Sequence, residues 1–150
     1  MNKVFFRSEE VPEPLWIKAA ESFVLSVLER LGHKNWDLSV LFCNNSFIKT
    51  LNAQYRNKDE PTDVLSFAIG EKSPGGRFSA GDIVISLDAL KENTRFFKVS
   101  QDEELRRLLV HGILHLSGED HETNGAEENM LKVQEEILSA LAKEQLQENA

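Results

Sequence analysis

Apolar side chains recur at close to helical spacing in three long stretches of the chain, which predicts three amphipathic helices. These stretches span residues 15–31, 101–116 and 126–143. Two more helices are expected over residues 45–56 and 87–97, because Asn or Ser side chains that can cap a first turn precede each of them. Glycine follows the first two amphipathic stretches, which is where a helix commonly ends.

Shorter apolar runs between these helices predict β-strands. They cover residues 4–7, 37–43, 64–69 and 82–85. The segment 70–81 contains Pro74 and two consecutive glycines, so it is expected to be a loop or a hairpin connection. We therefore predict that residues 1–150 form a single α+β domain, in which a mixed sheet of roughly four strands packs with several helices.

The composition is that of a folded protein with an acidic balance of charge. The 150 residues are 41% hydrophobic and 28% charged, and the formal net charge is −8. This charge argues against a protein that coats nucleic acid through positive charge alone, although it is compatible with a local basic patch. No apolar run approaches the roughly 20 residues of a membrane span, and the single cysteine, Cys43, cannot form an internal disulfide. We expect a cytoplasmic protein with no membrane partner.

Three of the four histidines lie close together, which points to a metal site. His111 and His115 are four residues apart on a predicted helix, so their side chains lie one turn apart on the same face. Gly118 permits a sharp turn after the helix, and this turn can bring His121 back as a third nitrogen ligand. Three nitrogen ligands with no evident fourth are typical of catalytic zinc, which keeps one position open for water. One zinc ion per chain is the expectation, and another divalent transition metal is the alternative.

The spacing of these histidines resembles two families of metal-dependent hydrolases. Metzincin metallopeptidases share it, but they carry Glu directly after the first histidine, where this chain has Gly112. The form His-Gly-x-Leu-His-Leu-x-Gly-x-Asp-His is more similar to the YbeY family of bacterial endoribonucleases, which act in ribosomal RNA maturation. Segments 51–67 and 81–86 resemble the other signatures of that family. Glu119 stands where the family commonly has an aromatic residue, and Ala68 where it commonly has proline.

The resemblance implies a single-strand-specific, metal-dependent endoribonuclease of small-subunit ribosomal RNA maturation and ribosome quality control. Arg56 matches the arginine that is implicated in RNA cleavage in the family, and a guanidinium can hold a phosphate through two hydrogen bonds. Asp120 and Glu119 adjoin the third histidine, where either could orient an imidazole or act as an acid or base. The sequence does not identify the general base.

The implied partners are single-stranded RNA or a ribosomal RNA precursor, together with the ribosome or ribosome-assembly proteins, and no DNA substrate is expected. Lys58, Lys72 and Arg77 flank loops that could form a small basic patch beside Arg56, so the affinity for RNA alone should be weak and sensitive to salt. His33 follows a glycine in a predicted loop and is expected to be exposed and uninvolved.

Two other functions stay open at this point. A metzincin-like peptidase or amidase would share the histidine spacing, but Gly112 counts against it unless Glu119 or Asp120 replaces the missing base. A ribosome-assembly factor would use zinc only structurally, and the absence of an evident fourth ligand near the histidines argues against that reading.

Overall fold

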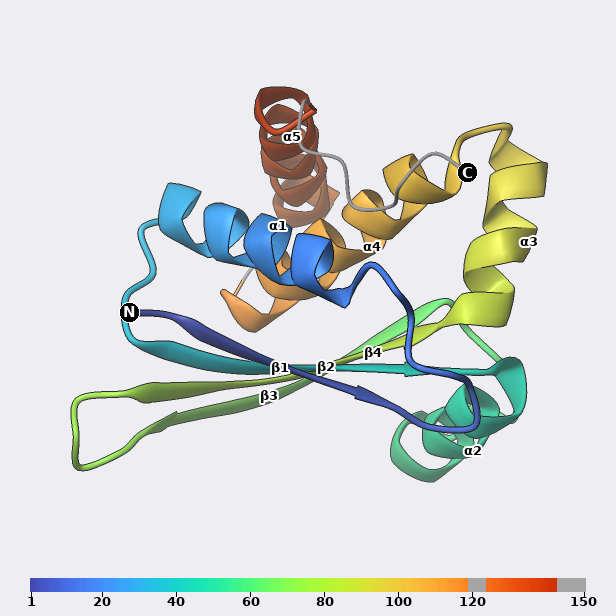
Figure 1. The fold of residues 1–150 in the computed structure, drawn as a ribbon, viewed down its shortest axis with the longest axis horizontal. Helices are drawn as coiled ribbons and strands as arrows, with labels where there is room; N and C mark the ends of the chain where they lie inside the picture. Colours follow the sequence, from blue (N-terminus) through green and yellow to red (C-terminus); the bar gives the residue numbers. More distant parts are fainter. Residues whose placement is uncertain (119–123, 143–150) are drawn as a thin grey trace.

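The chain contains both strands and helices in the regions that the hydrophobic pattern predicts, and its described part ends in three consecutive helices (Figure 1). The computed structural model describes residues 1–118 and 124–142, with the side chains of residues 1–118 and 129–142. In chain order the elements are β1 (Lys3–Ser8), α1 (Ile17–Arg30), β2 (Trp36–Cys43), α2 (Asn45–Arg56), β3 (Val64–Lys72), β4 (Phe78–Ser86), α3 (Leu87–Phe97), α4 (Gln101–Leu116) and α5 (Asn124–Ala140). The α+β class is confirmed.

The four strands of the described residues form one sheet in the order β1-β2-β4-β3. The pairs β1–β2 and β2–β4 are parallel, and β3 pairs antiparallel with β4. This arrangement confirms the predicted mixed sheet. It leaves β1 and β3 as the two edge strands.

The helices cover the two faces of the sheet unequally (Figure 1). Helices α1, α4 and α5 lie over one face, and α2 lies under the other, near the ends of β2 and β4. The larger apolar core fills the space under α1, α4 and α5. A smaller cluster lies under α2 and contains Leu41, Cys43, Ile48, Leu65 and Val84.

The connection between β3 and β4 is shorter than the sequence suggests. The predicted loop over residues 70–81 is wrong in its extent, because strand pairing continues to Lys72 and resumes at Phe78. One glycine in β4 also allows β3 and β4 to lie unusually close to each other. Gly81 has a φ of 146°, and a Cβ placed there would lie 2.2 Å from the carbonyl oxygen of Phe67. The strand therefore passes close to its neighbour at a point where the pairing register shifts, and only glycine fits.

Side-chain caps begin three of the helices, including the two for which a cap was predicted. The acceptors are Asn44, Ser86 and Ser100, which receive hydrogen bonds from the backbone N–H groups of Phe47, Ala89 and Glu103. Helix α1 begins at Ile17 rather than Leu15, whose side chain is fully exposed.

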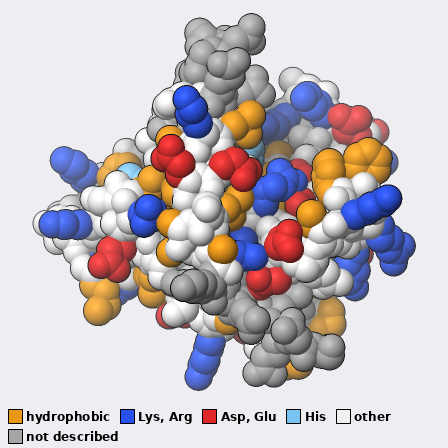
Figure 2. Space-filling model, turned by 90° about the horizontal axis from the view of Figure 1, so that it is seen from above, with side chains coloured by type: hydrophobic (Ala, Val, Ile, Leu, Met, Phe, Trp, Pro, Cys, Tyr) orange, Lys and Arg blue, Asp and Glu red, His pale blue; other side chains and the backbone are white. Residues whose placement is uncertain are grey.

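The outer surface over the helices carries charges of both signs. Figure 2, which views the molecule from above the helices, shows Lys and Arg side chains interspersed with Asp and Glu rather than gathered into one basic area. Among the helices of residues 1–118 and 124–142, none is long and apolar enough to cross a membrane.

Candidate metal centre

Helix α4 brings His111 and His115 together at the surface of the apolar core. Ser100 caps the helix, and the first turn carries three acidic side chains that favour the positive end of its dipole. The two imidazole rings, one turn apart, have centroids 4.6 Å apart and are inclined by 73°. Their Nε2 atoms are 3.0 Å from each other. Both side chains are half-buried, so this nitrogen pair is reachable from outside the protein.

The nitrogen pair has a spacing that suits one metal ion. Zinc binds imidazole nitrogen at 2.0–2.1 Å with tetrahedral angles, which places two such nitrogens about 3.4 Å apart. The observed 3.0 Å is within a few tenths of an ångström of that value. No group of three possible ligands is present within the described residues. The predicted third ligand, His121, lies outside the described residues, as do Asp120 and Glu119.

Gln134 on helix α5 holds the ring of His111. Its side chain is only 2% exposed, and its Oε1 lies 3.0 Å from Nδ1 of His111. An amide oxygen can only accept, so Nδ1 carries the proton and Nε2 keeps the lone pair that a metal needs. This residue was not predicted from the sequence. The feature of the sequence that indicates it is the position of a polar residue within the apolar stripe that Met130, Ile137 and Leu141 form at helical spacing.

Gly112 faces the sheet rather than the histidine pair. A Cβ added at this position would lie 2.9 Å from Cγ2 of Ile83 on β4, with two further atoms of the same side chain within 3.1 Å. The glycine therefore lets α4 approach the sheet closely. A glutamate at residue 112 would have to enter the packed core, so this helix cannot present a base there as metzincins do.

His33 contacts the end of α4, so the prediction that its side chain is exposed was wrong. Its ring stacks on Trp36 with centroids 3.7 Å apart, and its Nε2 lies 2.9 Å from Oγ of Ser117. The Ser117 hydroxyl donates to the carbonyl of Ile113, and it therefore accepts from Nε2–H of His33. Burial lowers the pKa of His33 below its ordinary value, because the charged ring is poorly solvated there.

Arg56 ends helix α2, on the other side of the sheet from α4 (Figure 1). Its side chain is exposed, and Asn57 follows it in the left-handed conformation with a φ of 57°. The loop after the helix is held by Asn52, which is 3% exposed and donates through Nδ2 to the carbonyl of Glu60 at 2.8 Å. This contact fixes where the chain leaves α2 and so fixes the base of the Arg56 side chain.

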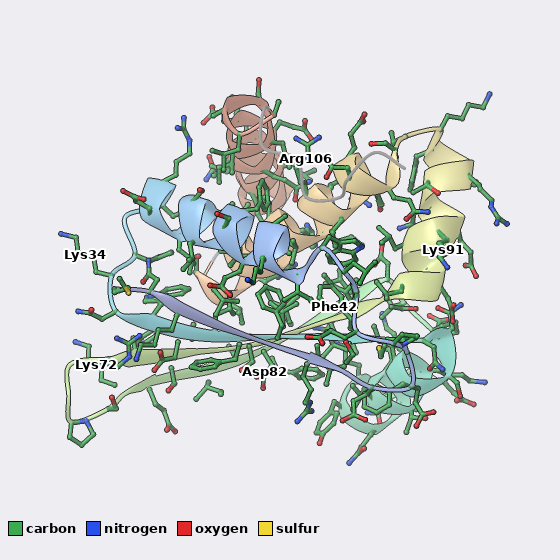
Figure 3. All side chains as sticks on the ribbon, in the orientation of Figure 1. Lys34, Phe42, Lys72, Asp82, Lys91 and Arg106 are labelled. Atoms are coloured by element: carbon green, nitrogen blue, oxygen red, sulfur yellow. The ribbon has the colours of Figure 1, made fainter. Side chains whose placement is uncertain are left out.

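The basic patch expected around Arg56 does not form as predicted. Lys72 lies at the hairpin end of the sheet in Figure 3, whereas α2 lies at the opposite end. Arg77 also leaves the patch, because its guanidinium forms an ion pair with Asp37 at 2.6 Å. Hydrogen bonding from that guanidinium lowers the pKa of Asp37. Asp37 therefore neutralises the charge of Arg77 at the hairpin end of the sheet, and this charge does not contribute to a basic patch around Arg56.

Comparison with known proteins identifies the family. A family model described as endoribonuclease YbeY matches residues 4–142. This chain belongs to the endoribonuclease YbeY family.

Relatives named endoribonuclease YbeY match over most of their length. A Treponema denticola protein is 52% identical over 135 residues, which cover 87% of each chain. A Treponema pallidum relative is 47% identical and covers 93% of this chain and 89% of its own. The solution structure of a Thermotoga maritima protein superposes with a TM-score of 0.62 at 26% identity, over 93% of this chain and 92% of that one. That structural match supports the fold described above.

The segments that resemble YbeY signatures meet in the structure. Asp63, just before β3, accepts a hydrogen bond from Asn93 at 3.0 Å, and the same Asn93 amide donates to Glu104 on α4 at 2.8 Å. Glu104 is 1% exposed and also accepts from Arg107, whose pKa it raises. Further along β3, Ser66 donates to the carbonyl of Gly112 at 3.4 Å. The loop that follows Arg56 is thus tied to the helix that carries the two histidines.

Proposed function

We propose that this chain is a single-strand-specific endoribonuclease whose metal ion is zinc, held by His111, His115 and His121. Its substrate is a ribosomal RNA precursor, and its role lies in small-subunit maturation and ribosome quality control. The ribosome or ribosome-assembly proteins deliver the substrate, because an acidic protein whose helical face carries charges of both signs has little affinity for RNA of its own.

The observation that carries the proposal is the convergence of two Nε2 atoms to 3.0 Å on a helix of a YbeY family member. A divalent metal held there by the histidines would supply Lewis-acid chemistry: it would polarise a phosphate oxygen and lower the pKa of a coordinated water. Gln134 keeps the His111 proton on Nδ1, so that Nε2 stays a ligand. Arg56 binds the scissile phosphate through its planar guanidinium and stabilises the charge that develops on it. Asp120 and Glu119 are the candidates for orienting His121 or moving a proton.

Two alternative functions differ from this proposal in the reaction that the metal site would catalyse. A metzincin-like peptidase or amidase is disfavoured, because position 112 faces Ile83 and cannot present a glutamate to the metal. A ribosome-assembly factor with structural zinc is the other alternative. It would bind the metal with the same residues but would cleave neither RNA nor peptide.

The test compares wild-type protein, His115→Ala and His33→Gln, each loaded with zinc, on a ribosomal RNA precursor and on defined oligopeptides. His33→Gln is the matched control, because it removes a histidine that lies outside the nitrogen pair. We expect RNA cleavage by wild type and His33→Gln, loss of cleavage and of bound zinc in His115→Ala, and intact peptides throughout. Peptide cleavage would favour the peptidase. Stoichiometric zinc with no cleavage of either substrate would favour the assembly factor.

A further inference from the structure

The face of the sheet that α1 and α4 do not cover is only partly covered by α2. Beside α2 it forms an open cavity of about 700 Å³. The lining includes Phe5, Ser39, Tyr55, Phe67 and Asp82. Figure 3 shows Asp82 below the sheet, on the side of α2. The volume lies in the range of small-ligand sites. Helix α2, which contributes Tyr55 to the lining, and helix α4, which carries the histidine pair, lie on opposite sides of the sheet (Figure 1).

One row of paired residues crosses the sheet and forms the floor of this cavity. Phe5 pairs with Ser39, Ser39 with Asp82, and Asp82 with Phe67, so that all four side chains point to the same face. Two phenyl rings thus flank a hydroxyl and a carboxylate. Phe5 is 56% exposed and Tyr55 is 61% exposed, and the Tyr55 ring lies 5.3 Å from that of Phe67. Exposed aromatic side chains gathered around a cavity mark a binding surface.

The Asp82 carboxylate indicates what the cavity binds. It is half-buried, and within residues 1–118 and 129–142 no hydrogen bond or ion pair engages it. A carboxylate accepts hydrogen bonds through both oxygens, so it suits a flat group with two adjacent N–H donors. The rings beside it suit a flat aromatic group that stacks. Guanine combines both features, because N1–H and the N2 amino group lie side by side on its edge.

We propose that this cavity binds a guanine base of a single-stranded RNA, stacked on Phe5 or on the Tyr55–Phe67 pair with its N–H edge on Asp82. The inference rests on the proposed function, since it takes RNA as the ligand. An arginine side chain of a protein partner would also match a carboxylate beside aromatic rings. Positive charge in the lining favours RNA instead, because Arg7, whose exposed guanidinium lies 3.7 Å from Glu9, is the basic residue among those that line the cavity. This side chain attracts phosphates and repels a basic peptide.

The cavity serves binding rather than bond cleavage. The edge strand β3 lies between it and helix α4, since Phe67 lines the cavity while the adjacent Ser66 contacts Gly112. A single strand that passes around this edge places one base in the cavity and another part of the chain near the histidines. The site therefore selects where the RNA is held relative to the cut.

The test measures binding of fluorescent single-stranded oligouridylates that contain one central guanosine or, in its place, inosine, which lacks the N2 amino group. We expect wild-type protein to bind the guanosine oligonucleotide about tenfold more tightly, because a hydrogen bond to a carboxylate is lost with inosine. Asp82→Asn should abolish this preference, and Phe5→Ala should weaken binding of both oligonucleotides. Phe96→Ala and Glu71→Gln are matched controls, because Phe96 and Glu71 are exposed and do not line the cavity, and both variants should bind as wild type does.

Equal binding of the two oligonucleotides by wild type, or a preference that survives in Asp82→Asn, would overturn the proposal. The proposal would also be overturned if Phe5→Ala and Asp82→Asn weakened the binding of a basic peptide but left the binding of RNA unchanged. Cleavage of both oligonucleotides is followed in parallel. Cleavage without any guanosine preference removes the subsite and leaves the nuclease intact. A guanosine preference that depends on Asp82 without any cleavage supports the cavity and refutes the proposed catalytic function.

Discussion

Replacing Gln134 with leucine should weaken metal binding far more than it weakens the fold. The side chain is 2% exposed, so water cannot take the place of its Oε1 against Nδ1 of His111. A neutral imidazole must carry one proton. If the proton stays on Nδ1 it becomes a buried donor without an acceptor, which costs about 1–3 kcal/mol. If it moves to Nε2 it blocks the nitrogen that faces His115.

Either tautomer of the His111 ring disfavours metal binding. The loss of such an orienting partner typically lowers metal affinity by about 10–100-fold, or roughly 1.4–2.7 kcal/mol. The metal-free fold can relax by moving the proton, so its free energy of unfolding should change by less than about 1.5 kcal/mol. Zinc affinity is measured by competition with a chromogenic chelator, and stability by denaturant unfolding of the metal-free protein. Gln134→Glu is the control, because it keeps an oxygen acceptor at the same place and should retain the affinity. Wild-type affinity in the leucine variant would refute the orienting role.

Three further predictions concern the arginine, the helix glycine and the fourth histidine. Arg56→Ala should lower the rate of single-turnover RNA cleavage by about two to three orders of magnitude, while zinc content and melting temperature stay unchanged. Arg56→Lys should recover only part of the rate. A wild-type rate in Arg56→Ala would exclude Arg56 from the mechanism. Gly112→Ala should destabilise the protein by about 1–2 kcal/mol in denaturant unfolding, since overpacking against Ile83 outweighs the gain in helix propensity. A more stable variant would show that α4 can move away from the sheet and contradict this prediction. His33 has a lowered pKa in the folded state, so its contribution to stability is complete above pH 6.5 and is lost as the pH falls through that lowered pKa. Melting temperatures of wild type and His33→Gln should therefore converge at acidic pH, and a constant difference would contradict the assignment.

The features that could be predicted are those encoded in neighbouring residues. Helical and alternating apolar patterns identified the elements of α1 to α5 and of the sheet, and caps were correctly expected before α2 and α3, where Asn44 and Ser86 provide them. The shared face of His111 and His115 also follows from helical geometry. These features need no knowledge of how distant segments meet.

What could not be predicted depends on contacts between distant parts of the chain. His33 was assigned to solvent because Gly32 precedes it, yet its partner Ser117 is 84 residues away. The ion pair between Arg77 and Asp37 joins two strands whose pairing the sequence does not specify. Gln134 acquires its role only once α5 packs on α4. From the sequence, Gly112 indicated only that a catalytic glutamate is absent at this position. In the structure it lets helix α4 approach the sheet closely.

The order in which the sheet assembles follows from its mixed pairing. The β3–β4 hairpin joins Lys72 to Phe78 across a short turn, whereas Ser39 pairs with Asp82 and Lys3 with Asp37 across long intervening segments. Closing a long loop costs entropy before the strands gain any contact, so the hairpin should form first and the two parallel pairings of β2 should follow. Substitutions in the hairpin should then slow folding, whereas substitutions in β1 should mainly accelerate unfolding. The part of the sheet that supports the histidine helix is thus the part that is built early.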